Sequence, residues 1–436
     1  MSLVLAAELT WTGTEFAPNV QVVVDAEGRI EALGELGRAD ASRLPGIALL
    51  PGFVDAHSHA FQRGLRGLGE TFPAGVGSFW SWREAMYALV DSLDRESLRR
   101  LSARAFAEMR DAGITTVGEF HYLHHERDGD FALDDAVVEA AADAGIRLVL
   151  LYSYYATGAP GQPLGGAQRR FATPSLDGFW GQVDRLAGVL DPRTQTMGIA
   201  PHSIRAASPG EIRLLQEEAR RRGLPVHMHV DEQRREIEES LAAYGRPPME
   251  VILEAMQGGP FTAVHCTHTA DEDMQRFLAS GGIACLCPLT EANLGDGIPR
   301  LARAHAASGR LAIGTDSNNR LAMLEEMRWL EYGQRLRGEC RGALLDPAGN
   351  VAPTLLEAGT AGGARALGVA VGRIAPGCWA DFAAVNLAAP ALAEVPRERL
   401  LEALVFGAGN EVIAGTYVGG KWRAGTGKRY AVRDKR

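Results

Sequence analysis

Short apolar runs alternate with amphipathic stretches through the middle of the chain. In residues 96–112 and 209–222, apolar positions recur three and four residues apart, which is the spacing of a helix with one buried face. The apolar runs, which predict strands, are residues 52–59, 114–121, 147–153, 197–202, 225–231, 261–266, 283–288 and 311–316. Strands that alternate with helices form parallel βα units. Eight such units predict an α/β fold of the (β/α)8, TIM-like barrel type.

The two ends of the chain have a different pattern of apolar and polar residues. Residues 1–48 read as short alternating strands with turns, and a strand-like pattern returns after Gly368. The simplest arrangement is a (β/α)8 barrel of residues 49–367 inserted into a small β-sandwich domain, which residues 1–48 and 368–436 build from both ends.

The composition excludes several classes of protein. Of the 436 residues, 46% are hydrophobic and 23% are charged, which is too apolar for a disordered chain. No apolar run approaches a membrane span, and the first residues lack the basic and apolar segments of a secretory signal. A net charge of −9 argues against a nucleic-acid partner. The five cysteines are scattered and never spaced as Cys-x-x-Cys, so we expect a reduced, cytoplasmic protein.

Polar residues concentrate at the carboxyl ends of the predicted strands. Barrel enzymes build their sites there, because the loops that follow the strands converge on one mouth. The residues at these ends include His57, His59, His121, His202, His227, His229, His265 and Asp316. So many imidazoles at one mouth predict a metal site.

Two His-x-His pairs are the strongest metal signal. His57 and His59 lie two residues apart, so on a strand they face the same side and can bind one ion. Neutral imidazole suits Zn2+ or Fe2+. On the fifth run His227 and His229 also face one way, and their spacing does not choose between them. His229 precedes Glu232 by three residues, which favours it as the ligand, because Glu232 then lies near water activated by the metal.

Asp316 offers a carboxylate at the end of the eighth run. The local sequence Gly-Thr-Asp-Ser is equally typical of a helix N-cap. The residue pattern alone therefore leaves both roles open.

Together these motifs resemble the amidohydrolase superfamily. The shared motifs are His-Ser-His after Pro-Gly-Phe-Val-Asp-Ala, His-x-x-Glu, a later histidine, Gly-Thr-Asp, and a closing Gly-Arg-Ile-Ala-Pro-Gly with Ala-Asp. The resemblance spans essentially the whole chain and implies a homodimer with one divalent metal, Zn2+ or alternatively Fe2+. The implied metal ligands are His57, His59, His229 and Asp316. The implied catalytic residues, which move protons and orient the attacking water, are Glu232, His265 and Asp316. The pattern favours His229 over His227, and His265 over His268.

Lysine is nearly absent from the chain. It occurs only at Lys421, Lys428 and Lys435, all outside the predicted barrel. Members of the superfamily with two metals bridge them through a carbamylated lysine on a barrel strand, so the resemblance implies a mononuclear site of the deaminase type.

Two arginines point to the substrate class. Arg83 and Arg205 are expected at the barrel mouth, where guanidinium groups bind carboxylates through two parallel hydrogen bonds. Each arginine taken alone is also compatible with a structural ion pair. Together they favour a small dicarboxylate.

Longer segments resemble the formimidoylglutamate deiminase family, which hydrolyses N-formimidoyl-L-glutamate to N-formyl-L-glutamate and ammonia in histidine degradation. They are His-Ala-Phe-Gln-Arg, Phe-Trp-Ser-Trp-Arg-Glu, Glu-Phe-His-Tyr and Thr-Glu-Ala-Asn-Leu-Gly-Asp-Gly. The implied substrate-binding residues are Gln62, Arg83, Tyr122, His202 and Arg205. Alternatives are a deaminase of guanine, cytosine or an adenosine derivative, imidazolonepropionase, and a silent barrel used as a binding protein, although a silent relative is expected to lose ligands.

The chain departs from the family pattern after Asp316. Asn318 stands where the family usually has a histidine, and Arg320 either adds a cation at the mouth or caps the following helix.

His124 and His125 lie beyond a predicted strand and are expected at the surface or in an interface.

Overall fold

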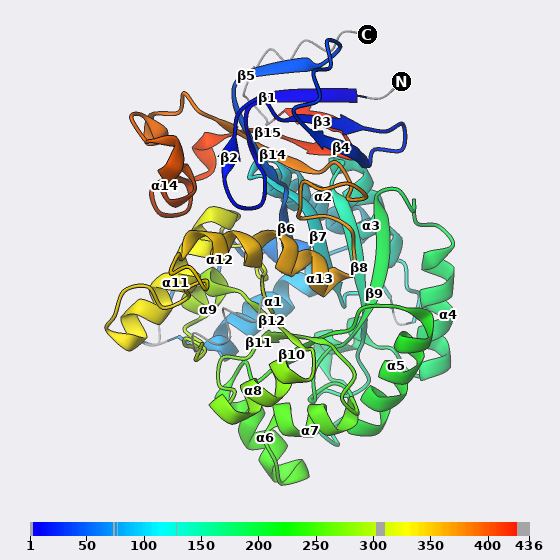
Figure 1. Cartoon of the computed structure of the whole chain (residues 1–436). Helices are drawn as coiled ribbons and strands as arrows, with labels where there is room; N and C mark the ends of the chain where they lie inside the picture. Colours follow the sequence, from blue (N-terminus) through cyan, green and yellow to red (C-terminus); the bar gives the residue numbers. More distant parts are fainter. Residues whose placement is uncertain (1–2, 73–74, 76, 128, 302–309, 425–436) are drawn as a thin grey trace.

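The barrel strands of the computed structural model follow the eight predicted apolar runs (Figure 1). The structure describes all residues except 1–2, 73–74, 76, 128, 302–309 and 425–436. The barrel strands are β6 (Phe53–Ser58), β7 (Ile114–His121), β8 (Arg147–Tyr154), β9 (Gln195–Pro201), β10 (His227–Val230), β11 (Thr262–His265), β12 (Ile283–Leu286) and β13 (Leu311–Ile313). All adjacent pairs along β6–β9 and along β10–β13 are parallel, as βα units require.

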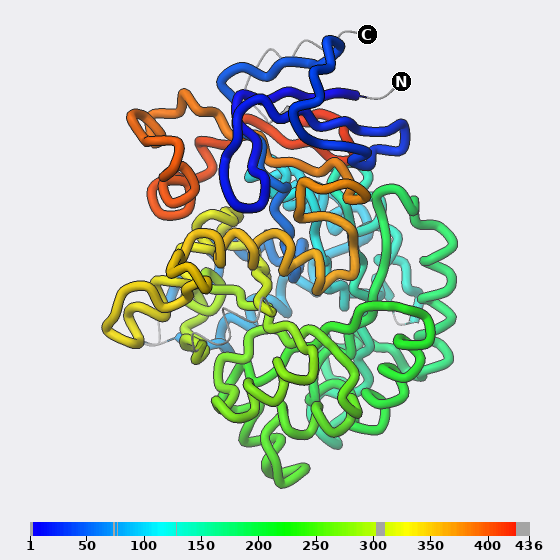
Figure 2. The backbone as a smooth tube through the Cα atoms, in the orientation of Figure 1, coloured from blue at the N-terminus to red at the C-terminus, as the bar shows by residue number. Residues whose placement is uncertain are grey.

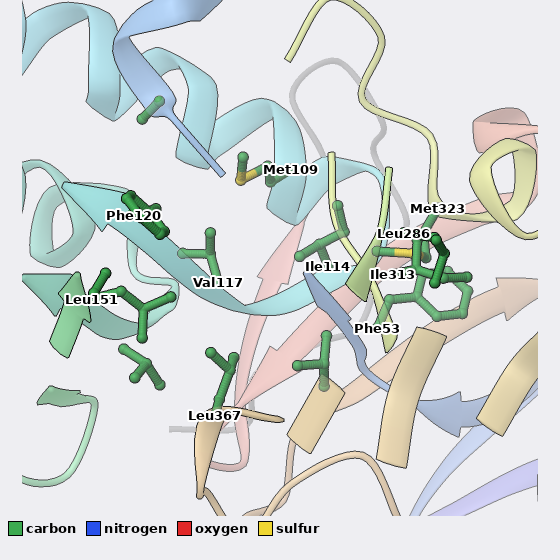
Figure 3. Packing of buried hydrophobic residues seen from close by; sticks show 14 of the residues in the cluster. Phe53, Met109, Ile114, Val117, Phe120, Leu151, Leu286, Ile313, Met323 and Leu367 are labelled. Carbon is green, nitrogen blue, oxygen red and sulfur yellow. The ribbon is translucent and has the colours of Figure 1, made fainter. Parts of the chain in front are cut away.

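Helices surround this barrel because both faces of a parallel sheet must be covered. Every residue of β7 and β8 is buried, which explains why these strands read as continuous apolar runs. Phe53 of β6, Val117 of β7 and Leu151 of β8 belong to one apolar core (Figure 3). The helices are α1 (Phe79–Ser92), α2 (Arg95–Asp111), α3 (Asp134–Ala144), α4 (Leu176–Ala187), α5 (Pro209–Arg222), α6 (Arg234–Tyr244), α7 (Pro248–Ala255), α8 (Asp271–Ala279), α9 (Pro288–Leu294), α11 (Met323–Gly338), α12 (Ala352–Glu357), α13 (Gly363–Leu367) and α14 (Leu400–Gly407).

The two chain ends meet in a second sheet, as expected for a β unit built from both ends. Figure 2 shows the N-terminal and C-terminal segments side by side above the barrel. Along this sheet the strand order is β16-β15-β14-β5-β1-β3-β4, with β2 paired to β1. The strands are β1 (Leu3–Trp11), β2 (Phe16–Ala17), β3 (Gln21–Val24), β4 (Ile30–Gly34), β5 (Ser42–Pro51), β14 (Phe382–Asn386), β15 (Ile413–Val418) and β16 (Lys421–Ala424).

An ion pair joins this sheet to the barrel. Arg147 at the start of β8 donates through Nε to Asp381 Oδ2 at 2.7 Å and through Nη2 to Oδ1 at 3.1 Å. Both side chains are buried, and the Arg147 guanidinium also lies over the Trp379 ring. Asp381 belongs to the closing Ala-Asp motif, so this motif holds the two units together.

The barrel ring has two seams, where strand pairing is short. Between β9 and β10 an isolated bridge joins Ile199 and Val226, and between β13 and β6 another joins Asp316 and Ser58. The barrel therefore consists of two four-stranded halves that meet edge to edge.

Within the described part of the chain, no helix combines the length and apolarity needed to cross a membrane.

Candidate active site

The His-x-His pair lies at the carboxyl end of β6. His57 and His59 are almost fully buried, and each has its Nε2 atom 3.3 Å from Asp316 Oδ1. His59 Nδ1 lies 2.9 Å from the carbonyl oxygen of Phe120. A carbonyl oxygen accepts only, so Nδ1 of His59 carries the proton and its Nε2 presents a lone pair toward Asp316.

Asp316 is held against β6 by its backbone. Its N–H donates to the His57 carbonyl at 2.9 Å, and its own carbonyl accepts from the His59 N–H at 2.9 Å. Its φ of +46° is unusual for a residue with a side chain, so this geometry depends on the surrounding contacts. Burial raises the pKa of Asp316, but its hydrogen bond with His57 and the charge of His265 outweigh this and hold the pKa below its usual value.

His229 completes the group from the other half of the barrel. Its Nδ1 donates to the His202 carbonyl at 3.1 Å, so its Nε2 also presents a lone pair. That Nε2 lies 3.2 Å from His57 Nε2. His227 is directed elsewhere, because its Nε2 donates to the Ala366 carbonyl at 2.8 Å.

These atoms fit a divalent metal ion. Burial lowers the pKa of His57 to about 3 and that of His229 well below its usual value, so the rings are neutral. Three donor atoms therefore converge around His57, inside the protein. They are the Nε2 lone pairs of His59 and His229 and a carboxylate oxygen of Asp316. We call the four expected ligands, His57, His59, His229 and Asp316, the ligand cluster. The structure also brings His265 into this group, because ligand atoms of His57, His229, His265 and Asp316 all lie within 4.8 Å of one another. Three neutral imidazoles and one carboxylate are a donor set suited to Zn2+ or Fe2+.

Two proton-carrying groups flank the ligand cluster. His265 Nε2 lies 3.8 Å from both Glu232 Oε1 and Asp316 Oδ2, and its Nδ1 lies 3.5 Å from Glu291 Oε1. Although burial opposes it, the negative charges of Glu232, Glu291 and Asp316 raise the pKa of His265 to about 10. Burial also raises the pKa of Glu232. The site thus holds groups that can donate and accept protons next to the ligand cluster.

The five residues proposed to bind substrate line the same cavity as the ligand cluster. The cavity is bounded by Gln62, Arg83, Tyr122, His202 and Arg205, together with His59, His229, Glu232, His265 and Asp316. Gln62 Nε2 donates to Tyr122 Oη at 2.9 Å, and Arg83 Nε donates to Tyr87 Oη at 2.6 Å. Arg205 Nη2 lies 3.5 Å from Glu232 Oε2. Arg83 and Arg205 therefore line the same cavity as three members of the ligand cluster, His59, His229 and Asp316.

A family model described as "Amidohydrolase family" matches residues 48–423. The chain belongs to the amidohydrolase family. A formimidoylglutamate deiminase from Pseudomonas aeruginosa strain PAO1 is 38% identical over 415 residues, which are 93% of this chain and 91% of that protein. A 5-methylthioadenosine/S-adenosylhomocysteine deaminase from Shouchella clausii strain KSM-K16 is 30% identical over 85% of this chain and 80% of its own.

Solved structures agree with this amidohydrolase in fold. An amidohydrolase from Brucella melitensis superposes with a TM-score of 0.81 and 32% identity, covering 97% of this chain and 96% of that one. An adenosine deaminase from Xanthomonas campestris, solved with bound zinc, has a TM-score of 0.81 and 24% identity over 97% of this chain and 92% of its own. The predicted fold class and superfamily are confirmed.

One expectation about this amidohydrolase was wrong. His124 and His125 are not at the surface, since both are fully buried. His124 Nδ1 and His121 Nε2 each lie 2.9 Å from Asp134 Oδ1, at the start of α3. His124 Nε2 lies 2.9 Å from the Ser153 carbonyl. Both nitrogens of His124 thus face oxygen atoms, and the Asp134 carboxylate lies between the two imidazoles of His121 and His124.

Other site residues of the amidohydrolase were missed in the sequence. Tyr87, Tyr155 and Phe171 line the cavity, and Glu291 contacts His265. Tyr87 follows Arg83 by four residues on α1, so helical spacing was the available signal. Arg320 donates through Nε to Glu325 Oε2 at 2.7 Å, in the first turn of α11, which supports the capping alternative.

Proposed function

We propose that the protein hydrolyses N-formimidoyl-L-glutamate to N-formyl-L-glutamate and ammonia, a step of histidine degradation. The observation that carries the proposal is the pairing of Arg83 and Arg205 with the ligand cluster in one cavity. The cluster is suited to hydrolysis at a carbon–nitrogen bond, and the two guanidinium groups suit a glutamate tail with two carboxylates. The 38% identity to a formimidoylglutamate deiminase supports the same substrate.

The ligand cluster would hold one divalent ion, which we propose to be Zn2+, with Fe2+ as the alternative. When bound, such an ion lowers the pKa of water and polarises the substrate. A single ion agrees with the lack of lysine before Lys421, because a carbamylated lysine bridge has no residue to form on.

The chain's own groups would bind the substrate and move its protons. Arg205 and Arg83 would bind the two carboxylates, and Gln62, Tyr122 and His202, which line the same cavity, would bind the rest of the substrate. Asp316 would accept the proton of the attacking water, and His265, 3.8 Å from Asp316 and protonated because of its raised pKa, would orient that water. Glu232, whose raised pKa favours the protonated form, would donate to the departing nitrogen, so that the carbon–nitrogen bond breaks and ammonia leaves.

The wider setting follows from the same resemblance. We propose a homodimer that works in the reducing cytoplasm, and domains of residues 1–48 with 368–436 and of residues 49–367. All five cysteines are unpaired, as a reducing compartment requires. Sedimentation of the purified protein tests the dimer, and limited proteolysis tests the domain boundaries.

The decisive experiment measures ammonia release from N-formimidoyl-L-glutamate by zinc-loaded protein and identifies the second product by mass. Ammonia with N-formyl-L-glutamate is the expected result. Formamide with free glutamate would assign cleavage to the other carbon–nitrogen bond. No reaction by metal-loaded protein, with turnover of guanine, cytosine, imidazolonepropionate or 5-methylthioadenosine instead, would refute the proposed substrate.

A further inference from the structure

The seam between β13 and β6 runs through the ligand cluster. His57 and His59 lie on one side of it, at the end of β6, and Asp316 lies on the other, just after β13. Strand pairing here is limited to the bridge between Ser58 and Asp316 and the backbone hydrogen bonds around it. The relative position of the carboxylate and the two imidazoles therefore depends on these few backbone bonds and on side chains that cross the seam. One of these is Asp55 of β6, whose carboxylate accepts from the N–H and the hydroxyl of Thr315.

Arg63 ties the loop after β13 to the segment after β6. It lies in the short 3-10 helix Ala60–Leu65 that directly follows His59. Its Nη1 atom donates to the carbonyls of Asn318 at 2.6 Å and Asn319 at 2.7 Å. The other edge of the guanidinium faces Glu108 of α2, to which Nε donates at 2.9 Å. The side chain is only 11% exposed, so water competes little with these bonds.

Asn318 makes the same connection in the opposite direction. Its Nδ2 donates to Ser58 Oγ at 3.1 Å and to the His59 carbonyl at 2.9 Å. Its φ of +57° turns the chain so that its own carbonyl and that of Asn319 both face Arg63. Asn tolerates this left-handed conformation better than most residues. The side chains of Arg63 and Asn318 thus cross the seam from opposite sides. Asn318 lies two residues after Asp316, and Arg63 lies four residues after His59.

We propose that Arg63, together with Asn318, is a positioning residue that holds the Asp316 carboxylate against His57 and His59. The planar guanidinium suits this role, because it reaches two carbonyls and a carboxylate at once. A metal ligand must be held within about 0.5 Å of its working position. Replacing a residue that contacts a ligand, but does not itself bind the metal, commonly lowers metal affinity or activity about 10- to 100-fold. The kinetic part of the inference rests on the proposed function, whereas the part concerning metal affinity does not.

Arg63→Met tests the inference, with Arg66→Met as a matched control. Arg66 is the next arginine along the chain, and its Nη1 lies 3.5 Å from the same Glu108, but among the described residues it forms an ion pair with Glu108 alone. For Arg63→Met we expect zinc affinity, measured by chelator competition, to fall about 10- to 100-fold. The visible spectrum of the cobalt-substituted protein should change, because the carboxylate shifts. Arg66→Met should match the parent protein, and Arg63→Lys should recover part of the affinity.

Kinetics separate positioning from substrate binding. With saturating metal, kcat should fall for Arg63→Met while KM stays within about twofold, since Arg83 and Arg205 are untouched. A raised KM with unchanged kcat would overturn the inference, because Arg63 would then act on the substrate.

The inference would also be overturned if Arg63→Met lost the same amount of stability in the metal-free and metal-loaded protein while its zinc affinity and cobalt spectrum stayed unchanged. If Arg63→Met does not fold, Asn318→Ala removes the opposite connection and takes the same measurements. Failure of the parent protein to release ammonia would refute the proposed function, while the affinity and spectral comparisons would still decide the role of Arg63.

Discussion

Replacing Arg205 by methionine removes a guanidinium group from the cavity while keeping much of the side-chain volume. Arg205 is only 8% exposed, and it faces the cavity beside Glu232. Truncating one partner of a buried, hydrogen-bonded charge pair costs about 2–5 kcal/mol, because the other charge is left unpaired. At about 3 kcal/mol, and about 1.4 kcal/mol per tenfold change, the expected rise in KM for N-formimidoyl-L-glutamate is about 100-fold or more.

The assay is steady-state ammonia release, and its control is a change in the substrate. If Arg205 binds a carboxylate, replacing that carboxylate by an amide should weaken binding to the parent protein but change little in Arg205→Met, so that the two effects are not additive. Arg205→Lys should give an intermediate KM, because one charge remains but the planar fork is lost. An unchanged KM in Arg205→Met would refute the assignment and place the carboxylate site elsewhere.

Three further outcomes follow from the structure. Asp316→Asn should lower kcat by at least about 100-fold while circular dichroism shows a retained fold; near-normal turnover would contradict its roles as ligand and base. Removing the metal should lower the melting temperature by about 5 °C or more, since an ion at 100 times its Kd stabilises the folded state by about 2.7 kcal/mol, and calorimetry before and after zinc is restored checks this. Asp134→Asn should cost about 3–5 kcal/mol of unfolding free energy in urea, because it removes a buried carboxylate that His121, His124 and the Tyr152 hydroxyl all contact; a loss below about 1 kcal/mol would contradict this structural role. Burial raises the pKa of Asp134, but His124 and His121 outweigh this and lower it, so its contribution to stability is complete above about pH 4 and is lost as the pH falls further.

Much of the fold could be predicted because its pattern is local. Each barrel strand is an apolar run followed by a helical period, and the observed strands differ from the predicted runs mainly at their ends. The run predicted at 225–231, for example, forms a strand only over His227–Val230. Strand pairing depends on the neighbouring strand as well as on apolar character, so such boundaries cannot be read from one segment.

The candidate site was predictable to the extent that strand ends position it. His57, His59 and Asp316 come together because the ends of β6 and β13 are neighbours in the ring. What could not be predicted depends on contacts between distant parts of the chain. Arg63 meets Asn318 across 255 residues, and nothing in its own segment marks the contact. His124 looked like a loop residue because its partner, Asp134, lies in the following helix.

The division of the barrel into two four-stranded halves has a consequence for how the protein matures. One half contributes His57 and His59 to the ligand cluster, and the other contributes His229 and Asp316, so the proposed ligand set is divided evenly between them. On the proposed function, the complete set exists only when both edges of the ring have docked. Ring closure and metal uptake would then be coupled, and a newly made chain that retains an ion would already have completed its barrel.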